Sequence, residues 1–375
     1  MLLLSVININ YLLNGVLALI MFGLGLSLKR EDFQALFDQP KSLAIGLFAQ
    51  MVLLPMLAAV LIYSAPLSPE WKVGIMILSV CPGGITSNLV SYFVKGNVAL
   101  AVSLTVCNAL LSLLSIPLMV NLFLTHIMNQ GTSVALPFWN TLLEIFVVTI
   151  IPAWLGMATR LRLGKKVSGI SKWLNVILPL LLLAVFGFKI LAGQDQGGTD
   201  MSAGDILILT PYVIGLNVLS MLLGFAVGIP FALSYRNRIT IAIEVGLHNT
   251  ALALLIAGDK LQMPAMEKPA LVYALYSVVV TFTVGYLLVL FREKVLKKSL
   301  DLGQDAFSVA DICSRGASCQ LAPKGKGSWG LLYPGRAYTY SGQMLASSSA
   351  WFHLWKCSRL SAPIISEKVC SGCSD

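Results

Sequence analysis

The sequence is poor in charged residues, which make up 11% of its 375 residues, and it contains only three histidines. A soluble domain carries about 25% charged residues, so a soluble globular protein is excluded. The sequence is instead rich in apolar residues, at 57% of the chain, and they gather in long runs. A bilayer core of roughly 30 Å requires about 20 apolar residues per helix. The chain is therefore predicted to be an all-α, polytopic membrane protein.

Motifs of intramembrane enzymes are missing as well. A metalloprotease would show His-Glu-x-x-His and an acyl hydrolase would show Gly-x-Ser-x-Gly, and the chain has neither. We therefore expect a protein that is not an enzyme. The net charge of +9 does not indicate a nucleic-acid partner, because the basic residues lie in short clusters between apolar runs. That arrangement is typical of membrane topology, with lipid as the surrounding partner.

Nine apolar segments are predicted to span the membrane. Basic residues gather in alternate loops, whereas the opposite loops hold only Lys72, Lys260 and Lys268, with Lys189 near a span end. Because basic loops face the cytoplasm, we expect the N-terminus outside and the C-terminus inside, in a plasma or inner membrane. The predicted spans are 10–28, 42–63, 73–94, 98–125, 138–158, 173–192, 205–233, 239–258 and 269–291.

Residues 295–375 differ from the apolar region. Helical periodicity ends there, and Gly, Ser, Cys and Trp are scattered without an apolar stripe, which is typical of loops. We expect a disordered tail after a transmembrane domain of residues 10–294 and a short N-terminal segment of residues 1–9. The lone CxxC pair, Cys370 and Cys373, has no second ligand pair nearby, so no metal site is expected in the tail.

The third predicted span is interrupted by proline, glycine and polar residues. Proline removes a backbone donor and glycine weakens a helix, so an uncoiled stretch is predicted. Uncoiled backbone at membrane depth survives only where it lines a cavity or is buried in protein. Its free carbonyls and adjacent side-chain oxygens suit a hard cation; the alternative is a proline kink with small packing residues. The segment reads Cys81-Pro82-Gly83-Gly84-Ile85-Thr86-Ser87-Asn88.

The eighth predicted span contains Glu244, the deepest acidic residue in the chain. A carboxylate at membrane depth needs a cation, a proton or a partner. His248 lies four residues further on and shares a helix face with Glu244 if the segment stays helical, while Gly246 between them loosens the backbone. The alternative is a buried Glu–His pair that only packs helices.

The two interrupted spans occupy matching positions if the chain is two inverted halves of five helices and the first half lacks its first helix. Broken helices at matching positions indicate a transporter binding site. Two further polar residues lie in mid-span, Gln50 and Thr105. Gln50 either supplies an oxygen ligand or makes a packing contact. Thr105 either joins the site or bonds its own i−4 carbonyl.

Three motifs in order along the chain resemble the bile acid:sodium symporter family. The similarity covers residues 10–292 and is greatest to a bacterial-type, nine-helix form of the family. Its first motif lies in the first span, and the other two lie in the interrupted spans. The motifs read Met21-Phe22-Gly23-Leu24-Gly25-Leu26-Ser27-Leu28-Lys29, then Cys81-Pro82-Gly83-Gly84 with Ser87-Asn88 and Lys95-Gly96-Asn97, then Glu244-Val245-Gly246 with Asn249.

The resemblance implies a panel domain and a core domain, with the two broken helices crossing in the core and two sodium sites beside the crossing. Asn249 and Thr86 would contact the substrate. The residues that the resemblance assigns to the first sodium site are Ser87, Asn88, Thr105 and Glu244. Those that it assigns to the second are Gln50, Glu244, His248 and the backbone carbonyls of Val245 and Leu247.

Two positions depart from the family pattern. His248 stands where the second site usually has glutamine, and Ala101 stands where the first site usually has serine. Histidine titrates near physiological pH, so we hypothesise that protons replace or supplement one sodium ion. The sequence predicts sodium-coupled symport of a small organic anion by alternating access. A proton-coupled transporter and a passive organic-anion transporter or channel are the alternatives.

Overall fold

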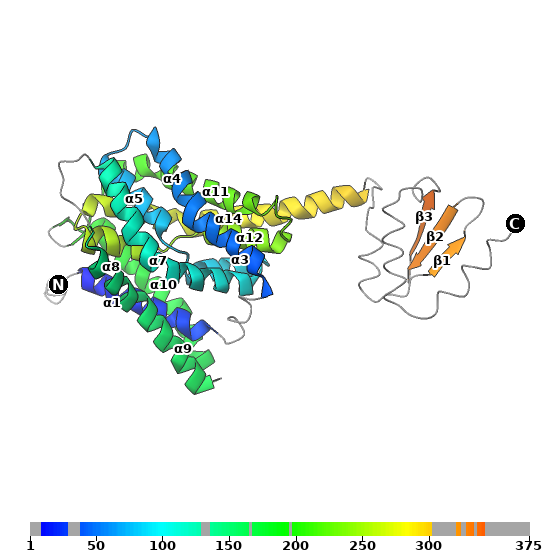
Figure 1. Ribbon diagram of the computed structural model, residues 1–375, viewed down its shortest axis with the longest axis horizontal. Coiled ribbons are helices and arrows are strands. Elements are labelled where there is room, and N and C mark those ends of the chain that lie inside the picture. Colours follow the sequence, from blue (N-terminus) through cyan, green and yellow to red (C-terminus); the bar gives the residue numbers. More distant parts are fainter. Residues whose placement is uncertain are drawn as a thin grey trace. The chain divides into compact units, whose positions relative to one another are not determined.

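A computed structural model describes residues 9–28, 38–128, 136–164, 167–194, 197–301, 320–323, 328–333 and 336–341. The chain divides into two compact units, Met1–Leu290 and Phe291–Asp375. Every regular element described in the first unit is helical (Figure 1). The predicted all-α fold is therefore confirmed for the membrane region.

Each predicted span coincides with one helix or with consecutive helical pieces. The short segments labelled η are π-helical turns, which are frequent at functional sites. The helical elements are α1 Ile9–Ser27, α3 Pro40–Phe48, η1 Ala49–Leu53, α4 Leu54–Tyr63, α5 Pro69–Val80, α6 Ile85–Phe93, α7 Val98–Ile127, α8 Phe138–Ile145, η2 Phe146–Ile150, α9 Ile151–Leu163, α10 Val167–Leu191, α11 Ala203–Val227, α12 Tyr235–Gly246, α13 Thr250–Leu254, η5 Leu255–Lys260 and α14 Pro264–Asp301.

Length and apolar composition identify the helices that are able to cross a membrane. Within the described ranges, six helices meet both criteria, and the bent pair α5–α6 makes seven if it counts as one span. The first and sixth predicted spans correspond to shorter apolar stretches, Leu12–Ser27 and Ile177–Leu191. A multi-pass membrane protein is thus confirmed, and the count of nine spans stays a prediction.

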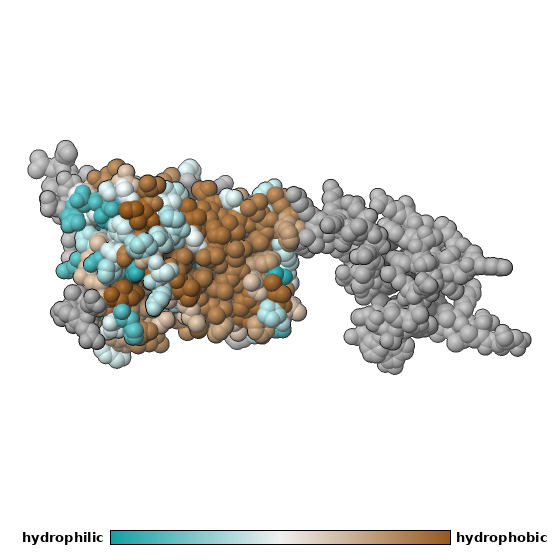
Figure 2. Space-filling view, turned by 90° about the horizontal axis from the view of Figure 1, so that it is seen from above, coloured by the Kyte–Doolittle hydropathy of each residue, from teal (hydrophilic) through white to brown (hydrophobic). Residues whose placement is uncertain are grey.

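The surface of the first unit agrees with this reading. Figure 2 shows a broad, continuous hydrophobic face, with hydrophilic residues gathered toward the ends of the unit. Large apolar side chains of several helices, such as Met56, Leu118, Trp154 and Leu180, are exposed in the first unit. Soluble monomers rarely expose apolar patches larger than a few hundred Å². We attribute this face to contact with lipid.

The helices of the first unit form two groups. α1 packs along α9 and α10, and η2 joins α8 to α9; we name these five elements the panel group. The remaining helices, α3 to α7 and α11 to α13, pack mainly on one another. α14 contacts α5 and α12, since a Cβ atom on Gly74 would lie 2.4 Å from the Met266 carbonyl oxygen and Tyr273 bonds the Gly246 carbonyl. We name these helices the core group. The two groups match the panel and core domains that the resemblance implies.

Within the panel group, glycines bring two backbones into contact. A Cβ atom on Gly25 of α1 would lie 1.9 Å from the carbonyl oxygen of Ala153 on α9. A Cβ atom on Gly156 of α9 would lie 2.1 Å from the carbonyl oxygen of Phe22 on α1. Small residues allow such close approach between membrane helices. The first family motif, which contains Gly25, is therefore a helix-packing motif in this fold.

The second unit contains regular structure within the segment for which the sequence favours disorder. Three antiparallel strands form a sheet in the order β1-β2-β3, in which Gly330 pairs with Thr339. The strands are β1 Gln320–Pro323, β2 Ser328–Tyr333 and β3 Arg336–Ser341. Their aromatic residues favour strands, whereas the sequence prediction rested on missing helical periodicity. The tail cysteines, among them Cys370 and Cys373, lie outside the described residues, and the domain boundaries stay a prediction.

Candidate functional site

The first break separates α5 from α6. α5 ends at Val80, α6 begins at Ile85, and the two helices are bent by 65°. Cys81 and Gly84 both have extended backbone conformations, with ψ angles of 130° and −163°. Pro82 lies between them, where it can donate no hydrogen bond. The uncoiled stretch predicted from proline and glycine is confirmed.

The second break separates α12 from α13. α12 ends at Gly246 and α13 begins at Thr250, with Leu247 in an extended conformation. The side chain of Asn249 caps α13, since its Oδ1 accepts a hydrogen bond of 3.1 Å from the N–H of Leu252. Asn249 was expected to contact substrate. Its side-chain oxygen has a capping partner in this conformation, and a substrate contact stays a prediction.

The two breaks meet. The backbone N–H of Asn249 donates a hydrogen bond of 2.7 Å to the carbonyl oxygen of Pro82. In an unbroken α-helix the Asn249 N–H would donate its hydrogen bond to the carbonyl oxygen of Val245. The Val245 carbonyl therefore loses its usual helical donor, as the resemblance expects for a carbonyl of the second site. A Cβ atom on Gly83 would also lie 3.2 Å from the carbonyl oxygen of Leu247.

Glu244 lies at this crossing and is 1% exposed. Its Oε1 accepts a hydrogen bond of 2.7 Å from Ser87 Oγ on α6. Thr105 Oγ1 on α7 lies 3.2 Å and 3.1 Å from the two carboxylate oxygens, and 3.3 Å from Asn88 Oδ1. All four residues expected in the first sodium site are therefore neighbours, contributed by three helices.

This cluster contains more oxygen acceptors than hydrogens. The Ser87 hydroxyl lies 2.7 Å from both Glu244 and the Gly84 carbonyl, and Thr105 Oγ1 also lies 3.0 Å from the Ala101 carbonyl. Each hydroxyl carries one hydrogen, so it satisfies one of these acceptors well. The Gly84 carbonyl also accepts from the Ser87 N–H at 3.2 Å. The acceptors that are short of donors are therefore the carboxylate oxygens of Glu244 and Oδ1 of Asn88. Such an excess of buried oxygens suits a hard cation or an added proton.

Basic residues do not supply that positive charge. In the portion of the chain that the structure describes, no Lys or Arg forms an ion pair with Glu244. The ion pairs that are present join Lys189 to Glu267, Lys260 to Glu144 and Asp259, and Lys268 to Asp205. An unpaired buried carboxylate is strongly disfavoured. A cation or a proton taken up from solution would neutralise it.

Of the residues expected in the second site, Gln50 contacts the backbone at the first break. Gln50, on the π-helical turn η1, donates from Nε2 to the Cys81 carbonyl at 3.3 Å. His248 is buried, and neither of its ring nitrogens has a hydrogen-bond partner among the described residues. Gln50 Oε1 is buried and has no hydrogen-bond partner among the described residues. A buried amide oxygen without a donor is costly, and a cation there would satisfy it.

Three other positions named from the sequence differ in their surroundings. Thr105 Oγ1 lies within hydrogen-bond distance of both the Ala101 carbonyl and Glu244, so the i−4 bond is present and a ligand role stays a prediction. Ala101 is buried and supplies only this backbone carbonyl. Thr86 is exposed in the first turn of α6. Its side chain is therefore accessible, as a substrate contact would require.

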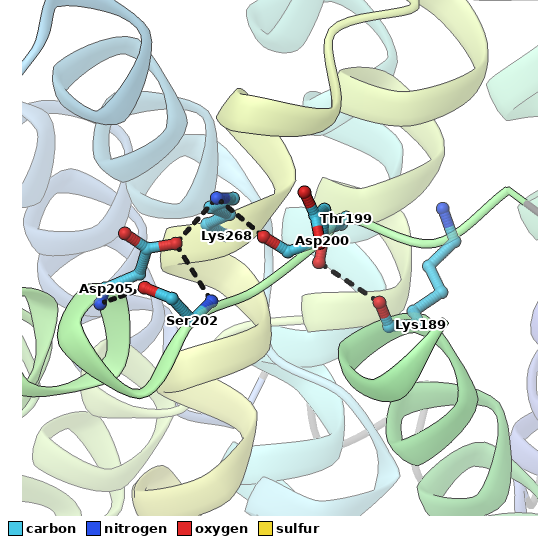
Figure 3. Close-up of polar contacts among 6 residues, drawn as sticks. All are labelled: Lys189, Thr199, Asp200, Ser202, Asp205 and Lys268. Atoms are coloured by element: carbon cyan, nitrogen blue, oxygen red, sulfur yellow. Dashed lines mark hydrogen bonds and ion pairs between the residues drawn. The ribbon is translucent and has the colours of Figure 1, made fainter. Parts of the chain in front are cut away.

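Sequence reasoning missed a group of charged residues near the start of α14. Lys189 of α10 and Glu267 of α14 form an ion pair whose side chains are 1% and 4% exposed. The adjacent Lys268 binds Asp205 at 2.6 Å and the Asp200 carbonyl at 3.2 Å (Figure 3). Figure 3 also shows Thr199 bonded to the Lys189 carbonyl. The sequence placed Lys189 near a span end but gave no signal of its partner.

Comparisons with known proteins agree with the family resemblance. The family model of the sodium bile acid symporter family matches residues 15–193. The chain is 29% identical over 283 residues to the "uncharacterized sodium-dependent transporter YocS" of Bacillus subtilis, which covers 75% of this chain and 83% of that protein. The matched regions include the first break and the panel helices.

Two mammalian relatives extend the comparison. The chain is 28% identical over 247 residues to the ileal sodium/bile acid cotransporter of Homo sapiens, covering 65% of this chain and 68% of that protein. It is 29% identical over 238 residues to the sodium-dependent organic anion transporter of Bos taurus, covering 62% of this chain and 60% of that protein. The chain thus spans about three-fifths of the bovine relative.

Proposed function

We propose that this chain, which belongs to the sodium bile acid symporter family, is a symporter that uses sodium binding at Glu244 to drive uptake of a small organic anion. The family consists of sodium-dependent transporters, and coupling to sodium is the general property that this chain shares with it. The anion and the transport mechanism are the parts that we propose.

One observation supports the cation site above all others. Glu244 is buried at the crossing of two uncoiled segments, with hydroxyl and amide oxygens around it and no basic partner in the described region. Sodium would neutralise the carboxylate and replace the missing donors. The alternative interpretation of Glu244 and His248 as a packing pair predicts a direct bond between them, and the structure gives Glu244 different partners.

The substrate class follows from the names of relatives and from one local feature. The mammalian relatives are named as transporters of bile acid and of organic anions. In this chain, α6 begins beside the cation site, and the exposed Thr86 lies in its first turn. The N-terminus of a helix carries partial positive charge and free N–H groups. An anionic group bound there would lie close to the neutralised Glu244.

Coupling would follow from a shared conformational preference. Sodium and the anion both favour the state in which the two breaks are ordered, so each raises the affinity for the other. Alternating access then requires the panel group to move against the core group. We propose the orientation that the basic loops indicate, with the N-terminus outside and the C-terminus in the cytoplasm of a plasma or inner membrane.

The test is uptake into proteoliposomes. A thermal-shift screen of organic anions, including a bile acid, with and without sodium first selects the probe. We expect the wild type to accumulate that anion against its gradient under an inward sodium gradient, and Glu244→Gln to lose accumulation while remaining folded. The matched control is Glu70→Gln, in the first turn of α5, which should transport normally. Accumulation by Glu244→Gln at the wild-type rate would remove the proposed site.

Proton-coupled transport is the second candidate function, and the presence of a titratable ring at His248 favours it. A protonatable ring takes the place of an amide oxygen beside the uncoiled segments. Uptake measured under separate sodium and pH gradients distinguishes the two couplings. A passive channel would equilibrate the anion and would not accumulate it under either gradient.

A further inference from the structure

The carbonyl oxygen of Gly246, the last residue of α12, is held by side chains from two other helices. Asn217 of α11 donates to it from Nδ2 at 2.7 Å, and the hydroxyl of Tyr273 of α14 donates to the same oxygen. Both side chains are buried at 1% exposure. Since Gly246 ends the helix at the second break, these two bonds fix the place where α12 becomes uncoiled.

A third residue completes this network. Asn217 Nδ2 lies 2.9 Å from the Tyr273 hydroxyl and 3.0 Å from Thr281 Oγ1, and Thr281 donates back to Asn217 Oδ1 at 3.3 Å. Every polar group of the network therefore has a partner. Fully satisfied buried networks are rigid and favour one arrangement. We call Asn217, Tyr273 and Thr281 the carbonyl clamp.

The clamp acts on the peptide between the proposed second-site carbonyls. A planar peptide leaves only two soft dihedral angles per residue. Fixing the Gly246 carbonyl toward α11 and α14 therefore restricts the directions of the Val245 and Leu247 carbonyls on either side. A Cβ atom on Gly246 would lie 2.3 Å from Met221 Cγ, so the backbone is also pressed against α11.

Tyr273 contacts the second site in another way. Its ring lies against the imidazole of His248, with ring centroids 5.2 Å apart and planes inclined by 35°. The hydroxyl holds one backbone carbonyl while the ring supports the side chain two residues further on. Neither Asn217 nor Tyr273 lies near one of the sequence motifs, so the sequence did not indicate that they act on this site.

We propose that Asn217 and Tyr273 are positioning residues for the second cation site, which set the directions of the Val245 and Leu247 carbonyls and of the His248 ring without touching the ion. This inference rests on the proposed function, because it requires that a cation binds at the crossing. Thr281 acts one step further out, since it contacts only Asn217 within the clamp.

Tyr273→Phe tests the proposal on the purified full chain. It removes the hydroxyl that bonds Gly246 and keeps the ring beside His248. Sodium is the probe, and the readout is the sodium concentration that gives half of the maximal rise in unfolding temperature. We expect this midpoint to rise about fivefold or more, the effect of one lost hydrogen bond. Tyr276→Phe, on the same helix and partly buried, should keep the wild-type midpoint.

Asn217→Leu is the second variant, in case Tyr273→Phe does not fold. Leucine is close to asparagine in volume and lacks the two N–H donors of the side-chain amide. We therefore expect a larger rise of the sodium midpoint than with Tyr273→Phe. In proteoliposomes, either variant should regain the wild-type maximal uptake rate at saturating sodium, which separates weakened positioning from a damaged fold.

The possible results separate the two proposals. A wild type that shows neither a sodium-dependent shift nor sodium-dependent uptake overturns the proposed function, and this inference with it. A normal sodium response in the wild type, together with unchanged midpoints in a folded Tyr273→Phe or Asn217→Leu, overturns the positioning role alone. A maximal rate that stays low at saturating sodium also contradicts it.

Discussion

The backbone N–H of Asn249 donates to the carbonyl oxygen of Pro82 at 2.7 Å and joins two uncoiled segments that are far apart in the sequence. This bond replaces one that a continuous helix would make, so each break helps to stabilise the other. Because Glu244 lies five residues before Asn249 and Ser87 five after Pro82, the crossing also brings these side chains into contact.

The first prediction concerns two adjacent glycines. A Cβ atom on Gly83 would lie 2.7 Å from Glu244 Oε2 and 3.1 Å from Ser87 Oγ, whereas one on Gly84 would meet nothing within 4 Å. Gly83→Ala should therefore displace the carboxylate and reduce sodium-dependent uptake by about tenfold or more, as overpacking costs of 1–3 kcal/mol imply. Gly84→Ala is the matched control. Equal uptake by both variants would show that Gly83 does not border the cation site.

The second prediction concerns the hydroxyl of Thr105. Thr105→Val keeps the shape of the side chain and removes its contact with Glu244, so the sodium concentration for half-maximal uptake should rise about fivefold to tenfold. Thr105→Ser should restore much of the affinity. The control is Thr149→Val, because Thr149 is also buried and bonds its i−4 carbonyl at 2.6 Å without a described contact to Glu244. An unchanged sodium dependence in Thr105→Val would exclude Thr105 as a ligand.

The third prediction concerns the buried ion pair of Lys189 and Glu267. Lys189→Met leaves the Glu267 carboxylate buried without its partner, which should cost about 3–5 kcal/mol of stability. The comparison is Lys268→Met, since the Lys268–Asp205 pair is more exposed, at 14% and 19%, and exposed pairs contribute about 0–1 kcal/mol. Thermal unfolding in detergent measures both. A larger loss in Lys268→Met would contradict the ranking by burial.

The fourth prediction concerns His248. Protonation of this ring would place positive charge beside the second cation site, so acidic pH should weaken sodium binding in the wild type. His248→Gln removes the titratable ring and keeps Glu244, where a proton competes with sodium, so its sodium affinity should depend on pH less steeply than that of the wild type. Uptake at several sodium concentrations between about pH 5 and pH 8 is the measurement. The same pH dependence in the wild type and in His248→Gln would exclude a titrating role for His248.

The fold was largely predictable because its signals are local. Apolar length identified the helical segments, and Pro82 with Gly83 identified the first break from backbone chemistry alone. Helix ends were predicted less well: α12 begins at Tyr235 and α14 at Pro264, each several residues before the predicted span. Polar residues occupy these ends, and apolar length carries no information about them.

The candidate site was predictable only in part. Matching broken helices indicated a binding site at the two interrupted spans, and the family resemblance assigned Glu244 and Ser87 to one sodium site there. The carbonyl clamp was not predicted, since Asn217 and Tyr273 are single polar residues in apolar helices. Their pairing depends on how α11 and α14 are rotated against α12, which no local pattern specifies. The same reason applies to Lys189 and Glu267.

Among the described residues, three polar links join the panel group to the core group: Lys189 to Glu267, Glu144 to Lys260, and Asn14 to Asp259. All three reach residues 259–267 of the core group, where η5 ends and α14 begins. Drawing the groups apart at this end would leave Lys189 and Glu267 as separate charges in a dry interior, at a cost of several kcal/mol for each ion. Water must therefore enter the interface between the two groups before they separate. We expect hydration of this interface, rather than the rigid-body movement of the groups, to set the rate at which they separate at this end.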